Sequence, residues 1–361
     1  MQVINDDCRN TMRAMDANSI SAIVTDPPYG LKFMGKGWDH SVPGVEFWQE
    51  ALRVAKPGCH LLAFGGTRTY HRLACAIEDA GWEIRDSLMW VYGSGFPKGH
   101  DVSKAIDKEA GAEREVIGSK RVKDIRRNVA EDIAMGKTDR QSKFAPGSPS
   151  IAINCNITAP STDDAKKWEG WNIALKPAYE PIILARKPLA GTVAGNVLEH
   201  GTGAVNIDAC RVGRDLGDVS GWSRSGSNAS ENRAMSGPNY ARNPKPDSEG
   251  RWPANFIYDG SDEVTDLLGS AARFFYCAKA SPSERGEHNT HATVKPLALM
   301  RYLIKLITPP NGIVLDPFAG SGSTLVAASQ LGFDAIGIEL DKVHCDIIER
   351  RLKDLQGVLA E

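Results

Sequence analysis

The chain has 361 residues, of which 42% are hydrophobic and 24% are charged, and its formal net charge is −2 at pH 7. This composition is typical of a globular protein with an ample core, and the length allows one large domain or two. The nearly balanced charge excludes a general attraction to polyanions, so a nucleic-acid partner would need locally clustered basic residues.

No apolar stretch reaches transmembrane length, and the amino terminus lacks the basic and apolar regions of a signal peptide. The seven cysteines are scattered and form no CxxC pair. This pattern favours a reducing cytoplasm, no membrane contact and no structural zinc site.

Residues 1–92 predict alternating strands and helices. Apolar runs predict strands at 21–25, 60–64 and 86–92. Helical periodicity predicts helices at 45–54 and 67–80.

The carboxyl-terminal region, residues 284–361, repeats this alternation. Its expected elements are a helix at 296–307, a strand at 312–316, a helix at 322–331, a strand at 334–340 and a final charged helix. Strands that alternate with helices indicate a parallel, doubly wound α/β sheet.

Between residues 93 and 283 the periodicity fades, and Gly, Pro, Ser and Asn become frequent. We expect a large insertion of loops and short elements there. Its basic residues gather in two tracts, which contain Lys120, Arg121, Lys123, Arg126 and Arg127 in the first and Arg211, Arg214 and Arg224 in the second. By count alone such runs indicate solvated helix faces, whereas a duplex-binding protein of this net charge would need them for phosphate contacts.

The segment "DPPY", residues 26–29, directly follows the first predicted strand. Pro27 and Pro28 must end that strand because proline cannot donate to a strand ladder. Asp26 and Tyr29 therefore lie on a stiff turn at the carboxyl edge of the sheet, where ligands of α/β proteins bind.

The segment "LDPFAGSGST", residues 315–324, predicts a strand, a glycine turn and a helix. Gly320 and Gly322 let a ligand approach the backbone, and Glu339 ends the next strand about 20 residues on, where a carboxylate can bind ribose hydroxyls. A dinucleotide site would need a third glycine where Leu325 stands, and a P-loop would need Gly-Lys-Ser/Thr. A ligand with a ribose and a carboxylate, S-adenosylmethionine, fits instead.

The motifs "DPPYG" and "LDPFAGSGST", in this order, resemble those of the beta class of DNA amino-methyltransferases, in which the catalytic motif precedes the cofactor motif. "NDDC" (5–8), "HATVKP" (291–296) and "GSGFPKGHDVSKAIDK" (93–108) resemble further segments of this family, the last one in its phage-like and orphan members. The resemblance implies a circularly permuted, mostly parallel sheet of the seven-stranded methyltransferase type. It also implies a catalytic half at 1–92, a loop-rich target-recognition insertion at 93–283 and a cofactor-binding half at 284–361.

By this resemblance the catalytic residues are Asp26, Pro27, Pro28 and Tyr29. The implied cofactor site consists of Asp7, Cys8, Asp26, His291, Thr293, Lys295, Asp316, Phe318, Ala319, Gly320, Ser321, Gly322, Thr324, Glu339 and Leu340. The expected DNA-binding residues are the basic residues of the two tracts, and no metal is expected.

The expected reaction is methyl transfer to the N6 amino group of an adenine that is flipped out of duplex DNA. This amine is a poor nucleophile. By the resemblance, the Asp26 carboxylate and the Pro27 carbonyl accept its two hydrogens while Tyr29 stacks on the base. Cytosine N4 stays open as the target, although family members that act on cytosine more often have serine at the position of Asp26.

Several of the implied cofactor residues have a second interpretation: His291, like Lys295, could lie in solvent, and Glu339 could be a solvated strand-end carboxylate. Asp316 either orders the glycine turn or touches the cofactor, and Thr324 either binds the cofactor carboxylate or caps the helix. Lys295 either pairs with a cofactor carboxylate or lies at a solvated helix end. Cys8 either lies near the cofactor adenine or is a small core residue.

Three other classes of protein fit less well. A methyltransferase of RNA or of protein glutamine usually has "NPPY" after the glycine motif, a non-catalytic DNA binder would have degenerate motifs, and a dehydrogenase would need glycine at Leu325. The expected partner is double-stranded DNA, and the family suggests a homodimer. We expect a cytoplasmic, nucleoid-associated protein of a bacterium or phage, with or without a partner restriction enzyme.

Overall fold

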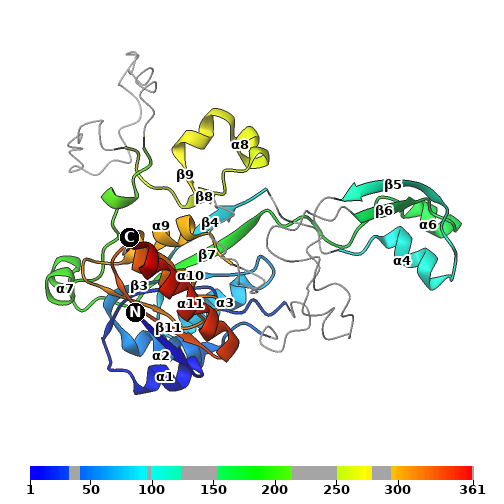
Figure 1. Ribbon diagram of the computed structural model, residues 1–361. Coiled ribbons are helices and arrows are strands. Elements are labelled where there is room, and N and C mark those ends of the chain that lie inside the picture. Colours follow the sequence, from blue (N-terminus) through cyan, green and yellow to red (C-terminus); the bar gives the residue numbers. More distant parts are fainter. Residues whose placement is uncertain are drawn as a thin grey trace, which may run out of the picture. The chain divides into compact units, whose positions relative to one another are not determined.

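The computed structural model describes residues 1–31, 41–93, 95, 99–122, 153–213, 250–278 and 294–359 (Figure 1). Nine strands of these described residues form one sheet: β1 (Gln2–Asn5), β2 (Ile20–Thr25), β3 (Ala55–Phe64), β4 (Glu83–Val91), β7 (Tyr179–Arg186), β8 (Phe256–Tyr258), β9 (Tyr276–Cys277), β10 (Ile313–Asp316) and β11 (Asp334–Glu339). Their order is β1-β11-β10-β2-β3-β7-β4-β8-β9. Every neighbouring pair is parallel except the two that involve β7, which runs antiparallel to β3 and β4.

The helices that accompany this sheet are α1 (Cys8–Ala14), α2 (Val45–Val54), α3 (Tyr70–Asp79), α7 (Val193–His200), α8 (Asp262–Leu268), α9 (Leu297–Ile307), α10 (Ser323–Gln330) and α11 (Lys342–Leu359), with short 3-10 turns η4 (Asp208–Cys210) and η6 (Gly269–Phe274). The prediction of a doubly wound, mostly parallel sheet is confirmed, and the helix predicted at 45–54 is α2 itself. The other predicted elements are present with shifted boundaries. β8 and β9 extend the sheet beyond the expected seven strands.

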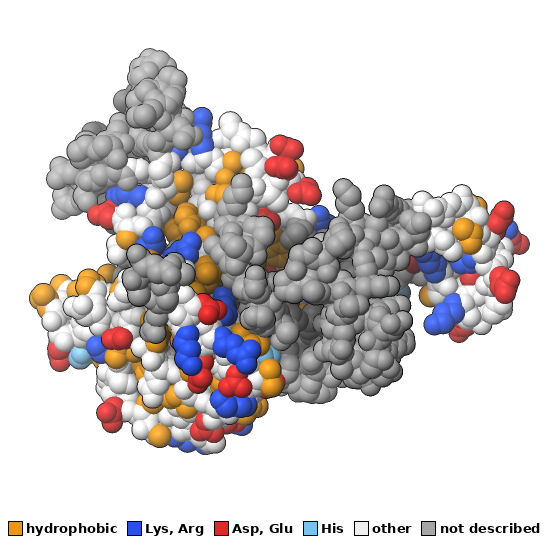
Figure 2. Space-filling view, in the orientation of Figure 1, with side chains coloured by type: hydrophobic (Ala, Val, Ile, Leu, Met, Phe, Trp, Pro, Cys, Tyr) orange, Lys and Arg blue, Asp and Glu red, His pale blue; other side chains and the backbone are white. Residues whose placement is uncertain are grey.

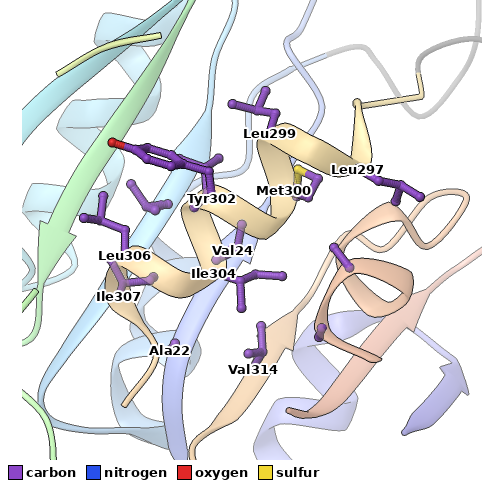
Figure 3. Packing of buried hydrophobic residues seen from close by; sticks show 14 of the residues in the cluster. Ala22, Val24, Leu297, Leu299, Met300, Tyr302, Ile304, Leu306, Ile307 and Val314 are labelled. Atoms are coloured by element: carbon purple, nitrogen blue, oxygen red, sulfur yellow. The ribbon is translucent and has the colours of Figure 1, made fainter. Parts of the chain in front are cut away.

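Helices cover both faces of the sheet, and each face has its own apolar core. On one face, α9 and α10 pack on β2 and β10; Figure 3 shows Ile304 of α9 in the same cluster as Val24 and Val314. On the other face, α1, α2 and α3 pack on β2 and β3 around Trp48 and Trp82. All six residues of β2 are buried, which explains why this strand reads as a continuous apolar run.

The predicted middle region, residues 93–283, is divided in the structure. Gly95–Pro177 form a compact unit of their own, whereas Met1–Ser94 and Ala178–Glu361 form the unit of the nine-stranded sheet. The expected boundary at residue 93 therefore lies close to the observed one. The expected boundary at residue 283 does not separate two units, because β7, β8 and β9 all pair within the main sheet.

The unit of residues 95–177 contains α4 (Val102–Glu109), a two-stranded antiparallel sheet of β5 (Val116–Val122) and β6 (Ile153–Thr158), and α6 (Asp163–Lys167). Its organising side chain is the buried Asp107, which accepts hydrogen bonds from Arg114, from the Ser161 and Thr162 amides and from the Thr162 hydroxyl. Burial opposes the ionisation of this carboxyl, but the hydrogen bonds outweigh it and lower the pKa of Asp107 to about 2. A single carboxylate thus joins α4 to the start of α6, and Arg114 continues the network to Thr158 of β6.

The chain leaves the main sheet for residues 95–177 and returns to it at one place. Strands β4 and β7 are antiparallel neighbours, with Val91 opposite Tyr179. Beyond this pair, the Tyr92 amide donates to the Ala178 carbonyl at 2.9 Å. The insertion therefore grows from the end of a β-hairpin without interrupting the sheet.

Helix α10 lies close to β11 because a glycine on the strand, not on the helix, provides the space. A Cβ atom at Gly337 of β11 would lie 2.6 Å and 2.8 Å from the two Cδ atoms of Leu325, and 3.1 Å from the Cβ of Ala319. Leu325 is fully buried. Leu325 can therefore occupy the position where dinucleotide-binding proteins have a third glycine, since Gly337 on the strand leaves space for its side chain.

We expect Gly337→Ala to destabilise the protein by about 1–3 kcal/mol, because it adds a methyl group to a filled contact. Leu325→Ala alone should cost about 2–5 kcal/mol by leaving a cavity. The double variant should lose less than the sum of the two, because each change relieves the other. Chemical denaturation of the wild type, the two single variants and the double variant tests this prediction. Strictly additive losses of unfolding free energy would contradict the coupling of Gly337 and Leu325.

Candidate active site

The two motifs meet because β2 and β10 are parallel neighbours in the sheet. Leu315 of β10 lies opposite Ile23 of β2, so both strands end at the same edge. Asp26 follows β2 and Asp316 ends β10. Segments far apart in the sequence thus place two carboxylates side by side at the carboxyl edge, where α/β proteins bind ligands.

Asp316 ties the turn of residues 26–29, which we call the catalytic turn after its predicted role, to the glycine turn of residues 317–322. Its Oδ1 accepts the Thr25 hydroxyl at 2.7 Å and the Phe318 amide at 3.1 Å, and its Oδ2 accepts the Thr324 hydroxyl at 2.5 Å. Burial raises the pKa of Asp316 to about 6, although the two hydroxyl donors oppose this. Of the two interpretations of Asp316, these contacts support the ordering of the turn.

The Thr324 side chain does not cap the helix, and its contact with a cofactor carboxylate stays a prediction. Its buried hydroxyl points to Asp316, and no side chain caps the start of α10, whose N-cap is Gly322. Ser321 is also buried, and its carbonyl accepts from Arg351 at 2.6 Å. These hydroxyl-bearing residues hold the turn together in this structure.

The glycine turn has the backbone geometry that its residues predict. Gly320 and Gly322 have φ angles of +53° and +79°, a region that favours glycine. A Cβ at Gly322 would also lie 2.8 Å from Ile348 of α11. The Glu339 carboxylate accepts the Gly320 amide at 2.8 Å and the Asp341 amide at 2.9 Å, so it lies directly against the turn.

Aromatic side chains flank the same turn. The Phe318 ring lies 5.8 Å from the Phe47 ring and 6.2 Å from the Trp48 ring, both on α2. Ala319 is buried. A planar ligand group at the turn would therefore have aromatic surface beside it.

At the amino terminus, Asp7 caps helix α1 by accepting the Arg9 amide, and its carboxylate also pairs with the Arg9 guanidinium at 2.7 Å. The hydrogen bond from the Arg9 side chain lowers the pKa of Asp7. Cys8 is buried in the core, as in its second interpretation, and burial raises the pKa of its thiol to about 12. Leu340 is 70% exposed.

Four polar side chains form an ion cluster beside the catalytic turn: Asp26, Tyr29, Glu180 of β7 and Lys295, which precedes α9. Lys295 Nζ lies 2.7 Å from Asp26 Oδ2 and 3.1 Å from Glu180 Oε2. The Tyr29 hydroxyl lies 2.9 Å from Asp26 Oδ1 and 3.0 Å from Glu180 Oε2, and it accepts from Lys295 at 3.2 Å. Because a hydroxyl has one proton, Tyr29 donates to one carboxylate at a time.

Burial and charge act in opposite directions on Lys295. Its side chain is 8% exposed, and Nζ lies 4.9 Å from the centre of the Phe64 ring. Burial favours the neutral amine, but the carboxylates of Asp26 and Glu180 outweigh it and raise the pKa of Lys295. Burial, reinforced by the same carboxylates, raises the pKa of Tyr29 well above its ordinary value, so the cluster contains an ammonium and a neutral phenol.

These contacts correct the expectation for Lys295 and add a residue that sequence reasoning missed. Lys295 does not lie at a solvated helix end, because its side chain is buried and pairs with Asp26. Its pairing with a cofactor carboxylate stays a prediction. Glu180 belongs to the segment "YEPIILAR", in which a carboxylate interrupts an otherwise apolar strand. That interruption was the available signal, but nothing in the sequence indicates that β7 lies beside β3.

The predicted DNA-binding residues are only partly within the described ranges. Lys123, Arg126, Arg127, Arg214 and Arg224 lie outside them, as do the predicted cofactor residues His291 and Thr293, and Lys120 and Arg121 are described only as backbone in β5. Arg211 is held locally, by Asp208 at 2.9 Å and over the Trp252 ring at 5.6 Å. Figure 2 shows Lys and Arg side chains interspersed with Asp and Glu on the described part of one face.

Among the described residues, no group of three or more His, Cys, Asp and Glu side chains could hold a metal ion. Within the same ranges, no helix combines the length and the hydrophobicity that a membrane crossing requires.

Asp316 generates a testable pH dependence. Its pKa of about 6 exceeds the ordinary value of 3.8, so the folded protein binds this proton more tightly than the unfolded chain does. Its contribution to stability is complete below pH 4 and is lost as the pH rises through 6. We expect the free energy of unfolding of wild type, relative to Asp316→Asn, to fall by roughly 2–3 kcal/mol between pH 4 and 7. Denaturant titrations of both proteins at pH 4 and pH 7 measure these free energies of unfolding. A difference between the two proteins that does not change with pH would refute the prediction.

Comparisons with known proteins identify the family of this chain. A model of the DNA methylase family, of the N6/N4 type, matches residues 20–350. Type II methyltransferase M.HindIII of Haemophilus influenzae is 24% identical over 394 residues, which cover 97% of this chain and 94% of that protein. Type II methyltransferase M.HinfI of Haemophilus influenzae is 41% identical over 66 residues, 18% of each protein. The crystal structure of the M1.HpyAVI–SAM complex aligns with 97% of this chain and 98% of its own chain, with a TM-score of 0.45 and 17% sequence identity.

The family match begins at β2, which carries the catalytic turn, and ends in α11, which packs against the glycine turn. The prediction of a DNA amino-methyltransferase is thus confirmed, and the chain belongs to the DNA methylase family of the N6/N4 type.

Proposed function

We propose that this methyltransferase is site-specific and transfers the methyl group of S-adenosylmethionine to N6 of an adenine flipped out of duplex DNA. The observation that carries this proposal is the position of Asp26. Its carboxylate lies at the carboxyl edge of β2, next to the glycine turn of β10, and the Thr25–Asp316 hydrogen bond joins the two.

The residues around the glycine turn fit the methyl donor. The Glu339 carboxylate accepts a hydrogen bond from the Gly320 amide. We propose that ribose hydroxyls donate to this carboxylate instead when the cofactor binds. Phe318 and Phe47 offer an apolar surface to a purine ring. When bound, S-adenosylmethionine supplies an electrophilic methyl group.

The catalytic turn prepares the amine for attack. The Asp26 carboxylate accepts one amine hydrogen and the Pro27 carbonyl accepts the other, which favours the pyramidal nitrogen of the transition state. The turn is held from both sides, because the Thr69 hydroxyl donates to the Tyr29 carbonyl at 2.7 Å and Thr25 bonds to Asp316. Both acceptors are therefore in place before the base arrives, and the Tyr29 ring offers a surface on which the flipped base can stack.

Adenine is preferred over cytosine as the target because aspartate opens the catalytic motif. The basic tracts of residues 120–127 and 211–251 are our candidates for the DNA-contacting surface, and the unit of residues 95–177 is our candidate for target recognition. Homodimer formation and a cytoplasmic, nucleoid-associated location remain part of the proposal.

We expect duplex DNA incubated with the protein and S-adenosylmethionine to contain N6-methyladenine, detected by mass spectrometry of nucleosides. Asp26→Ala should lower kcat by roughly 100-fold or more, since it removes a preorganised acceptor. Glu339→Gln should instead weaken the binding of S-adenosylmethionine by roughly tenfold or more, through the loss of a charged hydrogen bond.

The two variants separate chemistry from cofactor binding. Isothermal titration with S-adenosylmethionine shows whether Glu339→Gln acts on binding. N4-methylcytosine as the product would overturn the base assignment but keep the mechanism. Undiminished methylation by Asp26→Ala would refute the role of Asp26.

A further inference from the structure

We propose that Glu180 is a positioning residue for methyl transfer: its carboxylate balances the charge of Lys295, so that Asp26 keeps its negative charge for the amine of the target base. This inference rests on the proposed function of Asp26. It assigns a role to a residue outside both motifs, on the strand that runs antiparallel to its neighbours.

The geometry shows why Asp26 needs a second carboxylate nearby. Both of its oxygens already have a donor: Oδ1 accepts from Tyr29 and Oδ2 from Lys295. A lysine paired with Asp26 alone would neutralise it, and an incoming amine would find a weak acceptor. Glu180 lies 3.1 Å from the same Nζ and therefore shares the lysine.

Charge counting gives the consequence for the reaction. With both carboxylates ionised, the ion cluster carries a net charge of −1, since Tyr29 is neutral and Lys295 is an ammonium. In the transfer, the nitrogen lone pair forms the N–C bond and the C–S bond breaks with its electron pair going to sulfur. The positive charge passes from sulfur to nitrogen, which then loses a proton to water. A cluster with net negative charge stabilises the nitrogen cation; a neutral cluster would not.

The surroundings of Glu180 strengthen this effect. Glu180 lies opposite Trp90 of β4, and the Trp90 ring is 5.1 Å from the ring of Tyr92. Burial, together with the Glu180 carboxylate, raises the pKa of Tyr92 to about 12. Aromatic side chains of low polarity thus border the cluster, and charges interact more strongly there than in water.

Glu180→Gln tests the inference because it keeps the shape and an acceptor for Tyr29 but removes the charge. We expect kcat to fall roughly tenfold or more while KM for DNA stays within about twofold, since the loss concerns the transition state. Lys295→Met combined with Glu180→Gln restores a net charge of −1 and should recover part of kcat relative to Glu180→Gln. Glu83→Gln is the matched control: it breaks the 2.6 Å ion pair between Glu83 and Arg186 across the same β4–β7 pair and should leave kcat unchanged.

Ligand binding gives a readout without catalysis. S-adenosylmethionine carries a sulfonium charge, whereas S-adenosylhomocysteine is neutral at sulfur. In Glu180→Gln, the Kd for S-adenosylmethionine relative to that for S-adenosylhomocysteine should rise by about threefold or more, and it should return towards the wild-type ratio in the double variant.

A kcat of Glu180→Gln equal to that of wild type would overturn the inference. So would a double variant in which the losses of Glu180→Gln and Lys295→Met simply multiply, because Glu180 would then act by structure and not through the charge of Lys295. Undiminished methylation by Asp26→Ala would refute the role of Asp26 on which the inference rests, and a lack of N6-methyladenine with the wild-type protein would refute the proposed function, so these failures can be told apart.

Discussion

A buried hydrogen bond between neighbouring parallel strands holds the two halves of the site together. The Thr25 hydroxyl, at the end of β2, donates to Asp316, at the end of β10, across 291 positions of sequence. The Asp316 carboxylate also orders the glycine turn through Phe318 and Thr324. The proposed acceptor of the amine and the proposed turn for the methyl donor therefore belong to one hydrogen-bonded assembly, whose geometry depends on the pairing of these two strands.

A second constraint is electrostatic. The ion cluster is partly buried. Asp26 of the catalytic turn and Glu180 of β7 contribute its carboxylates, and Lys295, which precedes α9, contributes its ammonium. Burial favours the neutral amine of Lys295, and its contact with the two carboxylates keeps it an ammonium by raising its pKa. Removal of Lys295 would leave two partly buried carboxylates without their cation. Lys295 therefore links the two carboxylates, and in our proposal the three groups also act together in methyl transfer.

The sequence predicted those features that are local. The motifs placed Asp26 and Gly320 on turns after strands, and periodicity found α2 with its boundaries. Short elements such as β1 were missed, because four residues provide too little pattern. The partner of Lys295 could not be predicted, because local patterns do not tell which strand lies at which edge. The place of Glu180 in the site could not be predicted for the same reason. It belongs to a region without a motif, and its strand pairs antiparallel within a mostly parallel sheet.

The hairpin of β4 and β7 has a consequence for how such enzymes diversify. The unit of residues 95–177 begins and ends next to the hydrogen bond between Tyr92 and Ala178. A change in its length or sequence therefore need not alter the pairing of β4 and β7. The entropic cost of closing a longer loop also grows only slowly with its length. On our proposal that this unit recognises the target, lineages could exchange the segment as a cassette and acquire a new target sequence without changes to the main sheet.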